Sequence, residues 1–165
     1  MKHVITIFLS SFLIFGCVKG GVEQTKTQLQ IREFQTKNYE TKDTKMVMKA
    51  MLNVLQDDGY IVKNAVSDMG LLTAEKTIDV EDKGQAFMAT LFAGQHAKWN
   101  KASVIECSGN ISEFGNHVKV RVNFQVKTID NKGGIAEVKV VEDENYYQEF
   151  FSKVDKGVFI QKEKI

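Results

Sequence analysis

The fold of this chain is decided by the stretch VKVRVNFQVK, residues 118–127. Its even-numbered positions are valine or phenylalanine, and its odd-numbered positions are lysine, arginine, asparagine or glutamine. Successive side chains of a β-strand point to opposite faces of a sheet. The stretch therefore predicts a strand with one dry face and one wet face, and the dry face requires a covering layer.

Turn-forming residues on both sides of this strand predict further antiparallel strands. Residues 113–116 contain a Gly-Asn pair and lead back to an apolar-rich run at 102–111. Residues 130–134, DNKGG, turn the chain toward another strand at 135–141. Glycine and asparagine favour such turns because they tolerate backbone conformations that other residues avoid.

The first half of the chain predicts a helix followed by a hairpin. Asp43 or Thr44 can cap the helix, and Gly59 can adopt the left-handed conformation that closes one. Residues 60–66 and 71–78 predict two strands, joined by the turn-like residues 67–70. The apolar face of the helix recurs at helical spacing and consists of Met46, Val47, Ala50, Met51, Val54 and Leu55.

The two ends of the domain complete the expected fold. Leu29 and Ile31 alternate with polar neighbours, so residues 28–38 predict a first strand, while Asp143 can cap a last helix. That helix has an apolar stripe made of Tyr146, Tyr147, Phe150, Phe151, Val154 and Val158. Together these elements predict an α+β fold: an antiparallel sheet of about five or six strands with helices packed on one face. The arrangement resembles the helix-grip fold.

An insert separates the third and fourth predicted strands, because a hairpin needs only a few connecting residues. Residues 84–99 read GQAFMATLFAGQHAKW. The insert is either a short helix that closes the open end of the core, or a mobile flap that contacts a partner, a lipid or an apolar ligand. Its candidate contact residues are Phe87, Met88, Leu91 and Phe92, which follow helical spacing, and Trp99.

The N-terminal residues have the layout of an export signal. A basic start at Lys2 precedes an apolar stretch of about a dozen residues, which is too short to span a bilayer. Ile14-Phe15-Gly16-Cys17 resembles the lipobox of bacterial lipoproteins, which are cut before the cysteine and carry lipid on it. We therefore expect a signal peptide at 1–16, a lipidated Cys17 with a flexible tether to residue 27, and one domain at 28–165. An ordinary secretory signal or an uncleaved anchor is the alternative.

The resemblance to lipoproteins also implies a location. In Gram-negative cells, aspartate directly after the lipidated cysteine favours retention in the inner membrane, and this chain has Val18 there. The resemblance thus implies attachment to the outer membrane through the lipid on Cys17, with the domain facing the periplasm.

Charge and cysteine content exclude several classes of protein. The chain has 22 basic and 21 acidic residues and a formal net charge of +1, so no basic field indicates a nucleic-acid partner. If Cys17 carries lipid, Cys107 has no partner for an internal disulfide. Because Cys107 lies in an apolar-rich run, we expect it to be a buried core residue.

No pattern in the sequence indicates catalysis, a metal or a cofactor. His96 and His117 lack metal-ligand spacing, and the chain contains no nucleophile elbow or phosphate loop. Asp57 and Asp58 are expected to form a solvated helix end. We therefore expect a protein that is not an enzyme, with no metal site and no cofactor.

Two longer stretches resemble a family of uncharacterised bacterial envelope lipoproteins. The first is KAMLNVLQDDGYIVKNAVSDMGLLTAEK, residues 49–76, and the second is YYQEFFSKVDKGVFIQ, residues 146–161. That family offers no activity to carry over. The expected function is a membrane-anchored, non-catalytic lipoprotein that binds another envelope protein as an accessory subunit. The alternative is a carrier or sensor of an apolar small molecule or lipid, in a cavity lidded by residues 84–99.

Overall fold

The structure is a computed structural model that describes residues 26–78, 91, 102–129 and 133–163. The described helices and strands, in chain order, are α1 (Gln28–Phe34), β1 (Thr36–Tyr39), α2 (Thr44–Asp57), β2 (Ile61–Val66), the single 3-10 turn η1 (Ser67–Met69), β3 (Leu71–Ile78), β4 (Ser103–Phe114), β5 (His117–Ile129), β6 (Ile135–Val140) and α4 (Glu144–Glu163).

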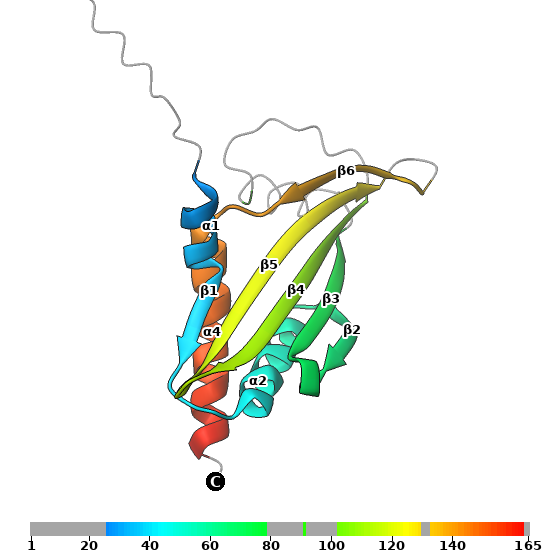
Figure 1. The fold of residues 1–165 in the computed structure, drawn as a ribbon. Coiled ribbons are helices and arrows are strands. Elements are labelled where there is room, and N and C mark those ends of the chain that lie inside the picture. The colour runs from blue at the N-terminus through cyan, green and yellow to red at the C-terminus, as the bar shows by residue number, and fades with distance from the viewer. Residues whose placement is uncertain (1–25, 79–90, 92–101, 130–132, 164–165) are drawn as a thin grey trace, which may run out of the picture.

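The strands form one antiparallel sheet in the order β1-β5-β4-β3-β2, and β6 also pairs with β5. Figure 1 shows α2 and α4 together behind this sheet, while no described helix covers its front. The expected α+β class, with an antiparallel sheet and helices on one face, is confirmed.

The alternating stretch behaves as its pattern predicts. The even-numbered side chains of residues 118–126 in β5 face the helices and are 0–1% exposed, whereas the odd-numbered side chains lie on the open face. The buried set is Val118, Val120, Val122, Phe124 and Val126. The predicted apolar face of α2 and most of the predicted stripe of α4 pack against them, and Tyr146 is partly buried beside the same core.

The expected first strand over residues 28–38 is wrong in its first half. Residues Gln28–Phe34 form helix α1, and only Thr36–Tyr39 form a strand. Thr27 and Gln30 form a capping box, in which each side chain bonds the backbone of the other. Leu29 is 77% exposed, so the alternation of Leu29 and Ile31 did not reflect a sheet face.

The predicted helix ends and turns of the first half are confirmed. The Met46 N–H donates to the Asp43 carboxylate at 2.8 Å, and Gly59 closes α2 with φ of 83°. In the β2–β3 hairpin, Gly70 has φ of 62°, and a Cβ there would lie 1.8 Å from the carbonyl oxygen of Ile111. Farther along, β4 continues to Phe114, so its turn is tighter than expected.

The side of β5 that faces β1 and β6 has a gap between these two strands. β1 pairs with residues 118–121 and β6 with residues 125–129. The Val122 N–H donates to the carbonyl of Gln35, and the Phe124 N–H donates to the Tyr147 hydroxyl at 3.1 Å. That hydroxyl donates in turn to the carbonyl of Val141 at 3.1 Å. The Val141 N–H donates to the Phe124 carbonyl at 2.9 Å, and a side chain from α4 thus bridges the one bond that is missing, from the Phe124 N–H to the Val141 carbonyl.

The Tyr147 hydroxyl also accepts a hydrogen bond from the C-terminal end of α1. The side-chain amide of Gln35, at the C-terminal end of α1, donates to the Tyr147 hydroxyl at 3.2 Å, and Gln35 is only 3% exposed. The ring of Phe34 packs 5.2 Å from the ring of Tyr147, measured between centroids. Burial raises the pKa of Tyr147, so its hydroxyl stays protonated and able to donate.

Replacing Tyr147 with phenylalanine tests this arrangement. We expect Tyr147→Phe to lower the free energy of unfolding by about 1–3 kcal/mol, because it leaves the buried Phe124 N–H and Val141 carbonyl without a partner. Tyr146→Phe is the matched control, since the Tyr146 hydroxyl bonds the Tyr60 hydroxyl at a partly exposed position. Equal losses in urea denaturation of the two variants would contradict the assigned role.

Candidate functional site

A groove lies between α1, β1 and α4, with a volume of about 620 Å³. Figure 1 shows α1 beside the first turns of α4. Residues of both helices line the groove. Residues 144, 148, 151, 152 and 155 of α4 line it, a spacing that belongs to one helix face. From the other side it is lined by Lys26, Gln30, Glu33, Phe34, Thr36 and Lys37.

One half of the groove is organised by an ion pair between β1 and α4. The Lys37 ammonium lies 2.6 Å from the Asp155 carboxylate, at a partly buried position. It also lies 5.9 Å from the ring centroids of both Tyr39 and Phe151. A cation over an aromatic face is attracted by the ring quadrupole, so Lys37 is held from several sides.

Tyr39, the last residue of β1, contacts Lys37 but does not line the groove. Its side chain is 6% exposed, and its hydroxyl interacts with the Asp155 carboxylate. Burial, reinforced by the negative charge of Asp155, raises the pKa of Tyr39 above its ordinary range. Tyr39 is therefore a neutral, buried group and is unsuited to acid–base chemistry near neutral pH.

The other half of the groove combines a cation and an exposed acid. The Lys26 ammonium lies 4.9 Å from the ring centroid of Phe34 and donates to the carbonyl of Glu142 at 2.8 Å. Glu33 is exposed and forms no ion pair with any described residue. Gln148 donates to Glu144 at 2.9 Å across one turn of α4.

The groove is therefore lined by two aromatic side chains, the partly exposed Phe34 and the buried Phe151, and by charged groups of both signs. A combination of aromatic and charged side chains is common on surfaces that bind another protein. Its described residues include no nucleophile with an adjacent base and no set of metal ligands.

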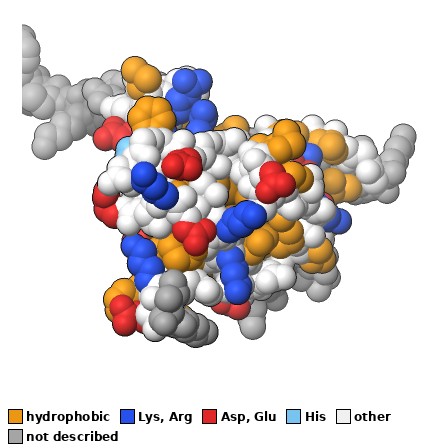
Figure 2. Space-filling model, turned by 60° about the horizontal axis from the view of Figure 1, so that its bottom comes forward, with side chains coloured by type: hydrophobic (Ala, Val, Ile, Leu, Met, Phe, Trp, Pro, Cys, Tyr) orange, Lys and Arg blue, Asp and Glu red, His pale blue; other side chains and the backbone are white. Residues whose placement is uncertain are grey.

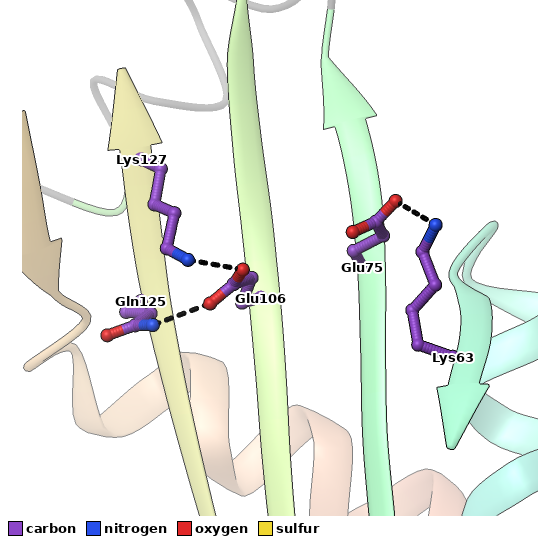
Figure 3. A network of polar contacts seen from close by, with 5 residues as sticks. All are labelled: Lys63, Glu75, Glu106, Gln125 and Lys127. Atoms are coloured by element: carbon purple, nitrogen blue, oxygen red, sulfur yellow. Dashed lines mark hydrogen bonds and ion pairs between the residues drawn. The ribbon is translucent and has the colours of Figure 1, made fainter. Parts of the chain in front are cut away.

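A row of polar side chains crosses the open face of the sheet (Figure 3). Glu75 and Glu106 lie opposite each other on β3 and β4, and like charges in that position repel. Each carboxylate has a partner of its own. Lys63 lies 2.5 Å from Glu75, whereas Glu106 accepts hydrogen bonds from Lys127 and, at 2.6 Å, from Gln125.

The network of polar contacts around Glu106 is explained by the stability of the sheet. The hydrogen bond from Lys127 is the largest effect on the pKa of Glu106 and lowers it below its ordinary value of 4.5, although partial burial opposes this. With both carboxylates compensated, the row needs no ligand to balance its charge. The groove is therefore the stronger candidate site.

Most residues singled out from the sequence fall outside the described part of the chain. These are Cys17, Phe87, Met88, Phe92, His96 and Trp99. Leu91 is described: it has helical backbone, is 4% exposed and belongs to the core cluster. The roles expected of the other insert residues and of Cys17 stay predictions.

Cys107 is buried, as expected, and burial raises the pKa of its thiol, which makes it a poor nucleophile. His117 is partly exposed, and its ring lies 5.6 Å from that of Phe114. Asp58, expected to be solvated, pairs with Lys153 at 2.5 Å. Within the described residues, no group of three or more potential ligands could hold a metal ion.

Among the helices that the structure describes, none is both long and apolar enough to cross a membrane.

Exposed apolar side chains do not form one continuous patch on the face drawn in Figure 2. They gather there in small groups, between which lysine, arginine, aspartate and glutamate side chains appear. This face therefore presents no broad apolar interface.

No sequence motif pointed to the groove, because its walls come from segments separated by more than 100 positions in the chain. The one available signal was the capping-box pattern Thr27-Gln28-Leu29-Gln30, which would have indicated the start of a helix at this position but not its place beside α4.

Fold and groove together define a small α+β domain with a candidate protein-binding site. No family model matches the chain, and no curated protein matches it. Among solved structures, it is similar to a TBP-like protein from Parabacteroides distasonis, with 9% identity, 74% of this chain and 90% of that chain covered, and a TM-score of 0.39. It is also similar to a DUF4468 family protein from Bacteroides ovatus, with 7% identity and a TM-score of 0.39. This match covers 74% of this chain and 84% of that chain. Similarities this distant carry no information on function.

The Glu106 contacts predict a pH dependence of stability. A carboxyl whose pKa is lower in the folded state stabilises the fold above its unfolded pKa, and this contribution is lost as the pH falls through the folded pKa. Stability should therefore fall below about pH 4.5 more steeply in the native chain than in Glu106→Gln. We expect a difference below about 1 kcal/mol, because the group is partly exposed.

A double-mutant cycle supplies the control for this measurement. In a Lys127→Met background, Glu106→Gln should change the pH dependence of urea denaturation much less than it does in the native chain. The same change in both backgrounds would show that the Lys127–Glu106 pair is not the cause.

Proposed function

We propose that this protein is a non-catalytic, lipid-anchored accessory subunit of the bacterial cell envelope, and that it binds a segment of another protein in the groove between α1 and α4. The observation that carries the proposal is the composition of the groove, which is lined by the aromatic side chains of Phe34 and Phe151 and by the charged Lys26, Glu33 and Asp155. An exposed acid with no described ion-pair partner, Glu33, gives a partner a charge to recognise.

The position of the groove in the chain supports the anchoring part of the proposal. The expected tether ends at residue 27, and Lys26, which borders the groove, follows Cys17 by only nine positions in the sequence. Lipid on Cys17 would hold the groove within a short distance of the membrane, where envelope proteins are available as partners. Among the described contacts, none favours the alternative function of an apolar carrier.

Site-specific photo-crosslinking tests the binding site. A photoreactive amino acid at Gln148, an exposed groove position, should capture a defined protein in intact cells. The same photoreactive group at Asn64 serves as the control, because Asn64 is exposed on β2, the strand at the opposite edge of the sheet from β1. Equal products from both positions, or no product from Gln148, would refute the proposed site.

A variant that fills the groove makes this test sharper. Ser152→Trp places a bulky ring in the groove from an exposed position and should reduce the Gln148 crosslink at least about tenfold, a loss of about 1.4 kcal/mol. Glu149→Trp adds the same ring at an exposed position of α4 that does not line the groove, and should leave the crosslink unchanged. Loss in both variants, or in neither, would contradict specific binding in the groove.

Metabolic labelling tests the anchor separately. Cells that express the chain should incorporate a fatty-acid analogue into it, and Cys17→Ser should abolish the label. The lipid contributes about 0.8 kcal/mol per buried methylene, so Cys17→Ser should also shift the protein from the membrane fraction to the soluble fraction. An unlabelled native chain would refute lipid anchoring and leave the groove proposal standing.

A further inference from the structure

Strand β6 is an edge of the sheet with apolar side chains on the helix-free face. The register places Val138 opposite Lys127 and Val140 opposite Gln125, both of which lie on that face. The two valines are 49% and 42% exposed. On its other side, β6 pairs with no strand that the structure describes.

The backbone of β6 offers hydrogen-bonding groups along this edge. The Val141 N–H donates to the carbonyl of Phe124 on β5 at 2.9 Å. Successive residues of an antiparallel strand direct their N–H and C=O groups to opposite sides. Since those of Val141 point toward β5, the N–H and C=O groups of Val140 and Val138 point away from it. Unpaired groups of this kind accept an additional strand readily.

Charges occupy the opposite face of the same strand. Glu137 lies opposite Thr128 and Lys139 opposite Val126, which places both on the helix side. Within one chain, the Lys139 ammonium lies 3.3 Å from the Glu137 carboxylate. The Glu137 side chain is 50% exposed and the Lys139 side chain 28%. The strand therefore carries one acid and one base, symmetrically placed around Val138.

We propose that β6 pairs in antiparallel orientation with β6 of a second copy of this chain, about a two-fold axis through Val138. In this register Val138 faces its own copy, and its outward N–H and carbonyl exchange hydrogen bonds with those of the second copy. Glu137 faces Lys139 of the second copy, and Lys139 faces Glu137. Two opposite-charge pairs flank a central pair of valines, which is the self-complementary surface that a two-fold dimer requires.

Charge also selects this register over its neighbours. A two-fold axis one residue later would place Lys139 opposite Lys139, and one residue earlier would place Glu137 opposite Glu137. Directly opposed like charges destabilise a strand pair, whereas opposite charges stabilise it. The order Glu-Val-Lys therefore favours an antiparallel copy of itself centred on Val138.

The interface is short, which sets its expected strength. β6 has six residues, and its pairing with β5 is irregular at the first of them. A weak association is therefore expected, which confinement to a membrane would strengthen by raising the local concentration. The residues of β6 do not line the groove between α1 and α4, so the dimer and the proposed function can be tested separately.

Disulfide trapping of the full chain in membranes tests the pairing. In Val138→Cys, the introduced thiol would face its own copy, at a Cα separation of about 5.5 Å that a disulfide can bridge. Mild oxidation with copper phenanthroline should then yield a covalent dimer. Ile61→Cys, 65% exposed on β2 at the far side of the sheet, is the control and should stay monomeric. Equal dimer yields from the two variants would overturn the proposal.

Charge exchange tests the register. In the Val138→Cys background, Glu137→Lys or Lys139→Glu alone should reduce the trapped dimer about tenfold, because each introduces two like-charge pairs. The combined exchange Glu137→Lys with Lys139→Glu restores both opposite-charge pairs and should restore the yield. If the single changes have no effect, or the combined exchange fails to restore the dimer, the proposed register is wrong.

Discussion

A strand at the centre of a sheet cannot leave its buried backbone groups unpaired, and between β1 and β6 one side of β5 has no neighbouring strand. The Tyr147 hydroxyl meets this requirement: it accepts from the Phe124 N–H and donates to the Val141 carbonyl. Because the side-chain amide of Gln35 donates to the same oxygen, one group from α4 joins the central strand, the entry to the last helix and the end of α1.

The groove depends on this arrangement. A helix as short as α1 is marginal alone in water, where about 12–15 residues are needed even for favourable sequences. Its position is set by the buried Ile31 and by the contacts of Phe34 and Gln35 with Tyr147. Since α1 forms one wall of the groove and α4 the other, the hydrogen bonds that complete the sheet also preform the site. A preformed surface binds a partner with less loss of conformational entropy.

The sequence predicted those parts of the fold that depend on a long periodic pattern. The alternation in β5 and the helical spacing in α2 and α4 each extend over many residues, so burial of one face determines the element. In α1, two apolar residues gave too short a pattern to distinguish a helix from a strand. The groove could not be predicted, because Lys37 and Asp155 meet only after the sheet has formed. Cys17 and most of the insert lie outside the described residues, so the roles expected of them rest on the sequence alone.

Amide hydrogen exchange, followed by NMR, is the most direct test of the Tyr147 hydroxyl as the missing partner of β5. The Phe124 amide donates to this hydroxyl, whereas Val120 lies in the part of β5 that pairs regularly with β1 on one side and β4 on the other. If the hydroxyl replaces a strand, both amides should exchange only through global unfolding, with similar protection. Exchange of the Phe124 amide orders of magnitude faster than that of Val120 would show that the gap is open, and would remove the basis for a preformed groove.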